Sequence, residues 1–413
     1  MQRRVVVTGL GIVTPLSCKV DECWQKVIAG ESGISELTIP GADRMRSRIA
    51  GHVIGWDPSD VLERRAANRL DRFTQFAMVA GAHAAADCGV DFEALDSWRG
   101  GVIVGSGIGG LGTIHEQMEK LISKGPERVS PMTIPKLMLN AAGGNLSICY
   151  GLRGPNYSVA TACASATNAM GNAYEAIRDN VIDLCITGGT ESAITPIAMS
   201  AFGNMRALSE RNDAPTLACR PFDTGRDGFV MAEGAGILVF EEMEAAKNRN
   251  AKIYGEVIGY GATGDAGHIT QPADDGAGAA EAMARAIKDA NIKPEEVDYI
   301  NAHGTSTPLG DKAETIAVKN VFGDHAYKLA ISSTKSMLGH SLGASGGIEM
   351  VLCVQAINNN TVPPTINLDE SDPDCDLDYT PNVAQERELK VAMSNSFGFG
   401  GHNASIMIRK FEA

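Results

Sequence analysis

A single cysteine lies in a stretch of the chain made almost entirely of small residues, SVATACASATNAMGNAYEAI at positions 158–177. SVATA predicts a short strand, and the residues from Ala164 to Asp179 predict a helix. Cys163 is therefore expected at a strand-to-helix junction, where unpaired backbone N–H groups and the helix dipole favour negative charge. We expect this environment to lower the thiol pKa below about 8.5 and to make Cys163 a nucleophile. An inert buried cysteine is the alternative.

Two histidines follow other predicted strands, each in a loop rich in Gly, Ser and Thr. His303 follows VDYINA, in HGTSTPLGD, and His340 follows LAISSTK, in KSMLGHSLGASGG. A further strand is followed by FGFGG at 397–401, where glycines allow tight turns and backbone N–H groups can face an oxyanion. Loops at the carboxyl ends of parallel strands gather at one site, so we expect these loops to surround Cys163.

One thiol and two imidazoles, with no carboxylate to orient them, favour a particular chemistry. A hydrolase triad uses one histidine as a base and must admit water. A carbon–carbon condensation on thioesters uses the thiolate to carry an acyl group, and then needs N–H donors in a dry pocket to stabilise an enolate. Two histidines suit that second task, so the pattern favours condensation over hydrolysis.

Apolar runs and helix-like stretches alternate along the chain, which predicts an α/β protein with a largely buried sheet. The predicted strands are 4–9, 101–107, 183–189, 236–242, 297–304, 329–335, 391–398 and 404–410. A polar connector near residue 250 is followed by a fresh strand, and the second half resembles a smaller version of the first. We therefore expect two domains, residues 1–250 with the cysteine and residues 251–413 with both histidines and the glycine loop.

Composition and charge argue against several function classes. A net charge of −14 disfavours nucleic acid as a partner, because phosphate binding needs a basic surface. No run approaches 18 apolar residues, so we expect a soluble, cytoplasmic protein that does not bind membranes. The cysteines and histidines lack C-x-x-C and H-x-x-x-H spacing, so no disulfides and no metal site are expected.

A glycine-rich loop gives a weak signal for a dinucleotide site. GSGIGG at 105–110 follows an apolar strand and matches G-x-G-x-x-G. No second strand ending in an acidic residue follows at the required distance. We therefore expect no nucleotide cofactor.

Five motifs resemble, in order, those of one enzyme family. They are ATACASA with Cys163, PFDTGRDGFVMAEGAG at 221–236, NAHGTSTPLGD with His303, SSTKSMLGHSLGASGG with Lys335 and His340, and NSFGFGG at 395–401. The chain resembles the 3-oxoacyl-acyl carrier protein synthases, with synthase II the nearest type, over essentially its whole length. The resemblance implies a thiolase-like fold, in which two similar halves form a five-layered αβαβα core, and a homodimer.

The resemblance also implies a reaction, the decarboxylative Claisen condensation of malonyl-acyl carrier protein with an acyl group held on Cys163. This reaction elongates a fatty acid by two carbons. No cofactor is implied, because the acyl carrier protein itself carries the 4′-phosphopantetheine arm. A ketosynthase of a polyketide or specialised fatty-acid pathway shares every motif. A chain-length factor usually lacks the nucleophile, and a degradative thiolase has a second cysteine in the glycine loop, where residues 395–403 contain none.

By the same resemblance, individual residues receive roles. His303 and His340 stabilise the enolate, and Lys335 supports the charge balance near the second histidine. The backbone N–H groups of Cys163 and Phe399 form an oxyanion hole, Phe399 gates the acyl pocket, and Glu349 holds loops together. Ile108 is expected to line the far end of the pocket from across the dimer interface. The other substrate-binding residues are Phe202, Thr270, Thr305, Thr307, Phe397, Gly398 and Gly400.

Four arginines in VLERRAANRLDRF, at positions 64, 65, 69 and 72, fall about one helical turn apart and are expected to share a helix face. On the sequence alone, a solvated face is the simpler interpretation. The resemblance instead implies a docking surface for the acidic acyl carrier protein, formed by Arg64, Arg65, Arg69 and Arg206. Two positions depart from the family pattern, His402, where threonine is usual, and Gln271, where a smaller residue is usual.

Overall fold

The computed structural model describes residues 3–412, and its main feature is a mixed sheet with the strand order β10-β9-β13-β14-β8-β1-β7-β6-β4-β5. The strands of the first half are β1 (Val5–Val13), β4 (Gly100–Gly105), β5 (Asn156–Val159), β6 (Leu184–Glu191) and β7 (Gly234–Glu242). Those of the second half are β8 (Gly255–Gly264), β9 (Tyr299–Asn301), β10 (Ala330–Ser332), β13 (Val391–Gly398) and β14 (His402–Lys410). Each predicted strand overlaps an observed one.

The two halves of the sheet repeat one arrangement. In each half, three neighbouring strands run parallel (β5, β4 and β6; β10, β9 and β13) and the two strands beyond them alternate in direction. The halves join where β1 and β8 pair over only three residues, Val5–Val7. Residue 250 lies between α9 (Met243–Asn248) and β8, and the division there into two domains stays a prediction.

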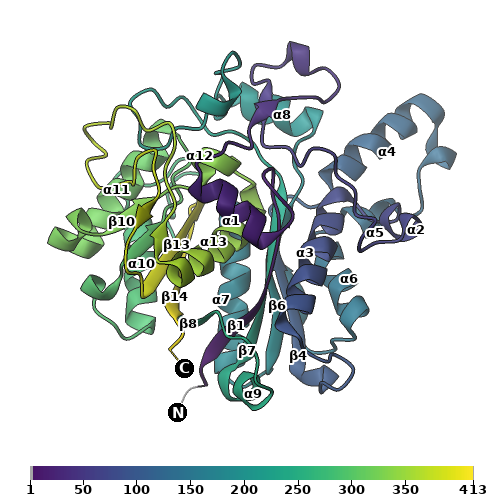
Figure 1. The fold of residues 1–413 in the computed structure, drawn as a ribbon. Coiled ribbons are helices and arrows are strands. Elements are labelled where there is room, and N and C mark those ends of the chain that lie inside the picture. Colours follow the sequence, from purple (N-terminus) through teal and green to yellow (C-terminus); the bar gives the residue numbers. More distant parts are fainter. Residues whose placement is uncertain (1–2, 413) are drawn as a thin grey trace.

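The helices form three layers around these two half-sheets, which gives the expected five-layered α/β core (Figure 1). One outer layer contains α3 (Arg72–Cys88) and α6 (Ala141–Tyr150), and the other contains α10 (Ala277–Asp289) and α11 (Pro308–Phe322). The central layer consists of α7 (Ser165–Arg178) and α13 (Ser345–Asn359), each of which contacts strands of both halves.

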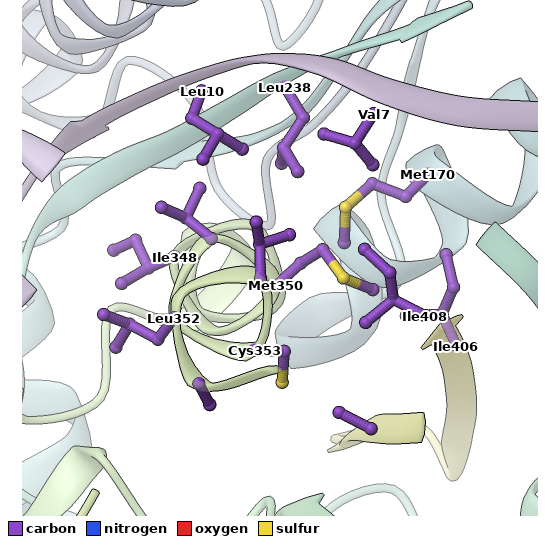
Figure 2. Packing of buried hydrophobic residues seen from close by; sticks show 14 of the residues in the cluster. Val7, Leu10, Met170, Leu238, Ile348, Met350, Leu352, Cys353, Ile406 and Ile408 are labelled. Atoms are coloured by element: carbon purple, nitrogen blue, oxygen red, sulfur yellow. The ribbon is translucent and has the colours of Figure 1, made fainter. Parts of the chain in front are cut away.

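Helix α13 is buried on every side, as expected for a helix that is apolar all round. Figure 2 shows its side chains Ile348, Met350, Leu352 and Cys353 packed among Val7, Leu10, Leu238, Met170, Ile406 and Ile408. Glycines allow the helix to approach the sheet closely, because a Cβ added at Gly236 would lie 2.2 Å from backbone atoms of Gly347 and Ile348. This close packing fixes where α13 begins, and its first residues reach the candidate site.

The remaining elements are short or peripheral. They are α1 (Val20–Ile28), α2 (Arg64–Ala67), α4 (Leu111–Lys124), α5 (Thr133–Leu137), α8 (Pro196–Asn204) and α12 (Lys335–Leu338), with two small sheets, β2 (Ser35–Glu36) with β3 (Ile49–Ala50) and β11 (Thr361–Val362) with β12 (Gln385–Glu386). Within residues 3–412, no helix is both long and apolar enough to cross a membrane.

The predicted arginine face is wrong in one respect. Helix α2 ends at Ala67, and a new helix, α3, begins at Arg72 because Asp71 accepts a hydrogen bond from the Phe73 N–H and caps it. Arg64, Arg65 and Arg69 are exposed. Arg72 instead makes a bidentate ion pair with the buried Glu233 and does not share their face.

Candidate active site

The three residues predicted to act together do meet in the structure. Cys163 lies in a short 3-10 turn, residues 162–164, directly before α7, and its Sγ is 3.1 Å from Nε2 of His340. The rings of His303 and His340 are nearly perpendicular, with centroids 5.4 Å apart. The sulfur and one nitrogen of each ring all lie within 4.8 Å of one another, and all three side chains are buried.

Both histidines are held through their backbone, which fixes their rings beside the sulfur. His303 follows β9, and its N–H donates to the carboxylate of Glu314 in α11, as does the N–H of Gly304. The N–H of His340 donates to the Val230 carbonyl, while its ring Nδ1 lies 2.9 Å from Ser345 Oγ. Glu314 and Ser345 were not singled out from the sequence, because their partners are defined only by the fold.

A cavity of about 580 Å³ opens over the three groups. The predicted residues that line it are Cys163, His303, His340, Ile108, Phe202, Arg206, Thr270, Thr305, Thr307, Phe397, Gly398 and Phe399. Ile108 lines the cavity of its own chain, and its contribution from across a dimer interface stays a prediction. Its loop lies beside the residues around Cys163, since a Cβ on Gly107 would lie 3.3 Å from the Ala162 carbonyl oxygen.

Other lining residues were missed in the sequence. Among them are Met205, Phe229, Asp265, Leu309 and Leu342. Their side chains are mostly apolar and come from five separate segments, so no local spacing marks them. The cavity is therefore suited to an apolar chain that reaches a polar end formed by Cys163 and the two histidines.

The glycine loop forms one wall of the cavity and is tied to the segment before α10. Gly400, which does not line the cavity, has a φ of 82° and donates its N–H to the Ile269 carbonyl. The Asp265 N–H donates to the Gly401 carbonyl, and Asn403 Nδ2 donates to Asp265 Oδ1. The rings of Phe399 and Phe202 face each other at 6.2 Å. Movement of either segment must therefore involve the other.

The two positions that depart from the family pattern lie at this wall. His402 is exposed at the start of β14, and a Cβ on Gly400 would lie 3.0 Å from its ring. Gln271 lines the cavity, and its N–H donates to His268 Nδ1. His402 is not among the residues that line the cavity.

Lys335 lies behind the two histidines and forms a buried ion pair with Glu349. Neither residue lines the large cavity. Within residues 3–412 the second carboxylate oxygen of Glu349, Oε2, has no hydrogen-bond partner. The positive charge of Lys335 acts on Cys163 and on both histidines, and it disfavours a metal cation among them.

The electrostatics of Cys163 differ from the prediction. Burial raises the pKa of its thiol to about 11, although the charge of Lys335 and the backbone N–H groups of Phe399 and Cys163 act in the opposite direction. The expectation of a lowered pKa is wrong because the sulfur is fully desolvated. Burial, and then the charge of Lys335, holds the pKa of both His303 and His340 well below 6.5, so both rings are neutral near pH 7.

The glycine-rich loop at 105–110 has a structural role. The backbone N–H groups of Gly107, Ile108 and Gly109 all donate to the carboxylate of Glu191, at 2.7 to 3.2 Å. Ser106 Oγ and the Gly343 N–H donate to the same carboxylate. A protein carboxylate thus fills the place that a phosphate would take, and it links Ile108 to the turn that follows His340.

Comparisons with known proteins show the family to which the chain belongs. A sequence model described as "Beta-ketoacyl synthase, N-terminal domain" matches residues 2–246, and one described as "Beta-ketoacyl synthase, C-terminal domain" matches residues 254–369. The chain therefore belongs to the β-ketoacyl synthase family. It is 49% identical over 409 residues, 99% of both chains, to 3-oxoacyl-[acyl-carrier-protein] synthase 2 of Coxiella burnetii. It is 49% identical over 411 residues, 100% of this chain and 99% of the other, to the Synechocystis protein of that name.

Solved structures share the whole fold. A β-ketoacyl synthase from Burkholderia phymatum superposes with a TM-score of 0.92 at 35% identity, over 100% of both chains. A complex described as a type II polyketide synthase acyl-carrier protein with its ketosynthase, AntDE:AntF, gives 0.91 at 35% identity, again over 100% of both chains.

The buried neutral state of His303 predicts a pH effect on stability. Below about pH 6.5 the unfolded chain takes up a proton on this ring and the folded chain does not, so acidification favours unfolding. A His303→Asn variant lacks this uptake. Between pH 7 and pH 5 the free energy of unfolding of the wild type should therefore fall by about 2 kcal/mol more than that of the variant, measured by urea unfolding. Equal losses would show that folded His303 takes up the proton as well.

Proposed function

We propose that this protein is a 3-oxoacyl-acyl carrier protein synthase, which elongates fatty acids by condensing malonyl-acyl carrier protein with an acyl group held on Cys163. One observation carries the proposal: a thiol and two neutral imidazoles lie within 4.8 Å of one another at the polar end of a largely apolar cavity. The names of the curated relatives at 48–49% identity support the same reaction. The cytoplasm is the compartment that we assign to this reaction.

Acyl transfer is the first half of the reaction. The Cys163 thiol passes its proton to Nε2 of His340, which lies 3.1 Å from the sulfur, and the thiolate attacks the carbonyl carbon of the acyl thioester. The carbonyl oxygen becomes an oxyanion that accepts hydrogen bonds from the backbone N–H groups of Cys163 and Phe399, both of which face the sulfur. The bond to the carrier's sulfur then breaks, and the carrier thiolate takes up a proton from water at the cavity mouth.

Condensation is the second half of the reaction. The thioester oxygen of the malonyl group accepts N–H donation from His303 and His340, loss of carbon dioxide leaves an enolate, and its carbon attacks the acyl carbon on Cys163. The bond from that carbon to Cys163 breaks and returns the thiolate. Neutral rings suit this step, because an N–H donor stabilises the enolate oxygen without protonating its carbon. The low pKa of both histidines keeps them neutral.

The malonyl and acyl groups arrive on an arm that the partner supplies, so the protein itself needs no cofactor. Thr305 and Thr307, whose hydroxyl groups lie 3.0 Å apart, line the cavity and would contact the phosphopantetheine arm, with Thr270 near the entrance. A polyketide ketosynthase is the second candidate. The solved type II polyketide synthase complex is 35% identical, against 48–49% for the synthase 2 relatives, which favours the fatty-acid pathway.

Replacing the nucleophile and one histidine separates the two half-reactions. Cys163→Ala should abolish acyl transfer, while His303→Ala should still form the acyl-Cys163 adduct but lose condensation by about 100- to 1,000-fold, because one enolate donor is gone. Intact mass after incubation with acyl-carrier protein reports the adduct, and release of carbon dioxide reports condensation. Loss of the adduct in His303→Ala would contradict this assignment of roles.

The carrier protein docks on the surface formed by Arg64, Arg65, Arg69 and Arg206. Within residues 3–412, none of the four forms an ion pair, although the whole chain has a net charge of −14. Arg206 lies at the cavity lining, with a φ of 58°. A local positive surface on an acidic protein would speed the encounter with an acidic partner.

Neutralising part of this surface should affect carrier substrates selectively. Changing Arg64, Arg65 and Arg69 to alanine should lower kcat/KM for acyl-carrier protein by about 10-fold or more at low salt and leave small thioester substrates unaffected. The control replaces three exposed lysines, Lys247, Lys252 and Lys390, and gives the same change in net charge. Equal losses on both kinds of substrate, or with both triple variants, would remove the docking role.

The protein is a homodimer in this proposal. Exposed apolar side chains gather on α4, α5, α6 and β5, which is the last strand at one edge of the sheet: Ile114, Met118, Leu121, Ile122, Ile134, Ile148 and Tyr157. An exposed apolar surface next to an open strand edge is typical of an interface between chains.

Charges placed on this surface should separate the dimer. The double change Ile122→Lys and Ile134→Lys, at positions that are 80% and 61% exposed, should give a folded monomer in sedimentation velocity measurements. Val383→Lys, also at an exposed position in a different segment, should remain dimeric. A wild type that sediments as a monomer, or a double variant that stays dimeric, would contradict the proposed interface.

A further inference from the structure

A line of hydrogen-bonding groups runs from Cys163 through His340 and away from the large cavity. Nε2 of His340 lies 3.1 Å from the Cys163 sulfur, and Nδ1 on the other side of the ring lies 2.9 Å from Ser345 Oγ. Ser345 Oγ lies 3.2 Å from Ser341 Oγ. All four side chains are buried. Imidazole and hydroxyl groups can each donate and accept, so the line can carry a proton.

This line ends at a second, much smaller cavity, which we call the rear cavity. It has a volume of about 10 Å³, near the space that one water molecule needs. Ser341, Ser345, Lys335 and Glu349 are among its lining residues. The side chain of Glu349 is 97% buried, and its Oε2 has no hydrogen-bond partner within residues 3–412. A buried acceptor without a partner, next to a polar space of this size, indicates a site for one ordered water.

In the resting state of the site, the proton of the Cys163 thiol needs an acceptor beyond His340. Burial raises the pKa of the Cys163 thiol to about 11 and lowers the pKa of His340 well below 6.5. A proton transferred from the sulfur to His340 would therefore not remain on the ring. The thiolate forms readily only if the proton moves on to a group that can hold it. Burial also raises the pKa of Glu349, which makes its carboxylate a suitable acceptor.

We propose that His340, Ser345 and Ser341 form a proton relay that passes the proton of the Cys163 thiol, through one water in the rear cavity, to Glu349. The proposal rests on the proposed function only in that Cys163 is the nucleophile. Before acyl transfer His340 carries its proton on Nδ1 and accepts the thiol proton on Nε2. After the transfer it carries its proton on Nε2, where it can donate to the enolate of the condensation step.

Each step of the relay breaks one bond to hydrogen and forms another. The S–H bond breaks as Nε2–H forms, and Nδ1–H breaks as a new O–H forms on Ser345. Ser345 gives its original proton to Ser341, Ser341 gives its own to the water, and the water protonates Glu349. When condensation returns the Cys163 thiolate, the same steps run in reverse. No oxidant or reductant takes part, and the number of protons on the enzyme is unchanged.

The charges around the line favour this exchange. At rest Lys335 is paired with the Glu349 carboxylate. When Glu349 takes up the proton, the positive charge of Lys335 is free to stabilise the Cys163 thiolate. The summed charge of Cys163, Lys335 and Glu349 is thus the same before and after the proton transfer, so no charge has to leave or enter the interior. His303 is neutral, and Glu191 accepts hydrogen bonds from the glycine-rich loop. Glu233 also lines the rear cavity, but it is paired with Arg72. The Glu314 carboxylate acts on Glu349 as well, and it accepts hydrogen bonds from the N–H groups of His303 and Gly304.

An internal exchange predicts an unusual pH profile for the reactivity of Cys163. In the wild type the rate of alkylation of Cys163 by iodoacetamide should change by less than about 3-fold between pH 6.5 and 8.5, because no proton is lost to solvent. Glu349→Gln keeps an acceptor for Lys335 and cannot take the proton. Its rate should rise about 10-fold per pH unit. Mass spectrometry of the Cys163 peptide distinguishes this cysteine from the other eight.

Removing the middle of the line tests the path. Ser345→Ala removes the hydroxyl that accepts the proton from Nδ1 of His340, so the ring cannot pass the thiol proton on, and alkylation should slow about 10-fold. Ser345→Thr keeps the hydroxyl and should restore the rate. Ser341→Ala should slow alkylation as well, and the Ser341→Ala, Ser345→Ala double variant should be no slower than Ser345→Ala. Ser336→Ala, which removes a buried hydroxyl outside the line, should react as the wild type does.

Three results would overturn the relay. They are a wild-type rate that already rises 10-fold per pH unit, a Glu349→Gln profile that matches the wild type, and Ser345→Ala alkylation at the wild-type rate. Alkylation needs no carrier protein or malonyl group, so these results are independent of whether the proposed condensation occurs. Circular dichroism and the melting temperature of each variant separate a lost relay from a lost fold.

Discussion

The contact between the Cys163 sulfur and His340 Nε2, at 3.1 Å, brings together one reactive side chain from each half of the molecule. Cys163 precedes α7 of the first half, and His340 precedes α13 of the second. Both helices lie in the central layer, where each contacts both half-sheets. The position of one atom relative to the other thus depends on the packing of that layer, and the glycines of β7 and α13 that allow close approach are part of the site's construction.

The two halves also share a short 3-10 turn before the central helix, and the turn has a different role in each half. Each central helix is preceded by a short 3-10 turn with one residue at positive φ, Ala162 at 49° and Leu342 at 47°. In the first half the turn presents a nucleophile. In the second half the equivalent position is Gly343, whose N–H donates to Glu191, and His340 lies two residues before the turn. The same backbone conformation therefore occurs next to both members of the reacting pair, Cys163 and His340.

Burial determines the electrostatic behaviour of the site. A fully desolvated thiol holds its proton more strongly than a free one, while desolvated imidazoles lose theirs more easily. The three reacting side chains, Cys163, His303 and His340, are therefore neutral at rest, and the ion pair of Lys335 with Glu349 lies near them. Neutral N–H donors and backbone amides stabilise developing negative charge without a permanent charge beside the substrate. This arrangement also explains why the destination of the thiol proton matters.

The sequence by itself determined the order of the elements, the three reactive side chains and the loops that carry them, because apolar periodicity and strand-end placement are local properties. Through the resemblance to a family it also predicted substrate-binding residues, and all of these except Gly400 line the cavity. The tertiary structure alone decided the direction of the Cys163 pKa shift, the separation of Arg72 from its neighbours and the partners of Glu191 and Ser345. Each of these depends on desolvation or on contacts between elements distant along the chain, which no local pattern of residues contains.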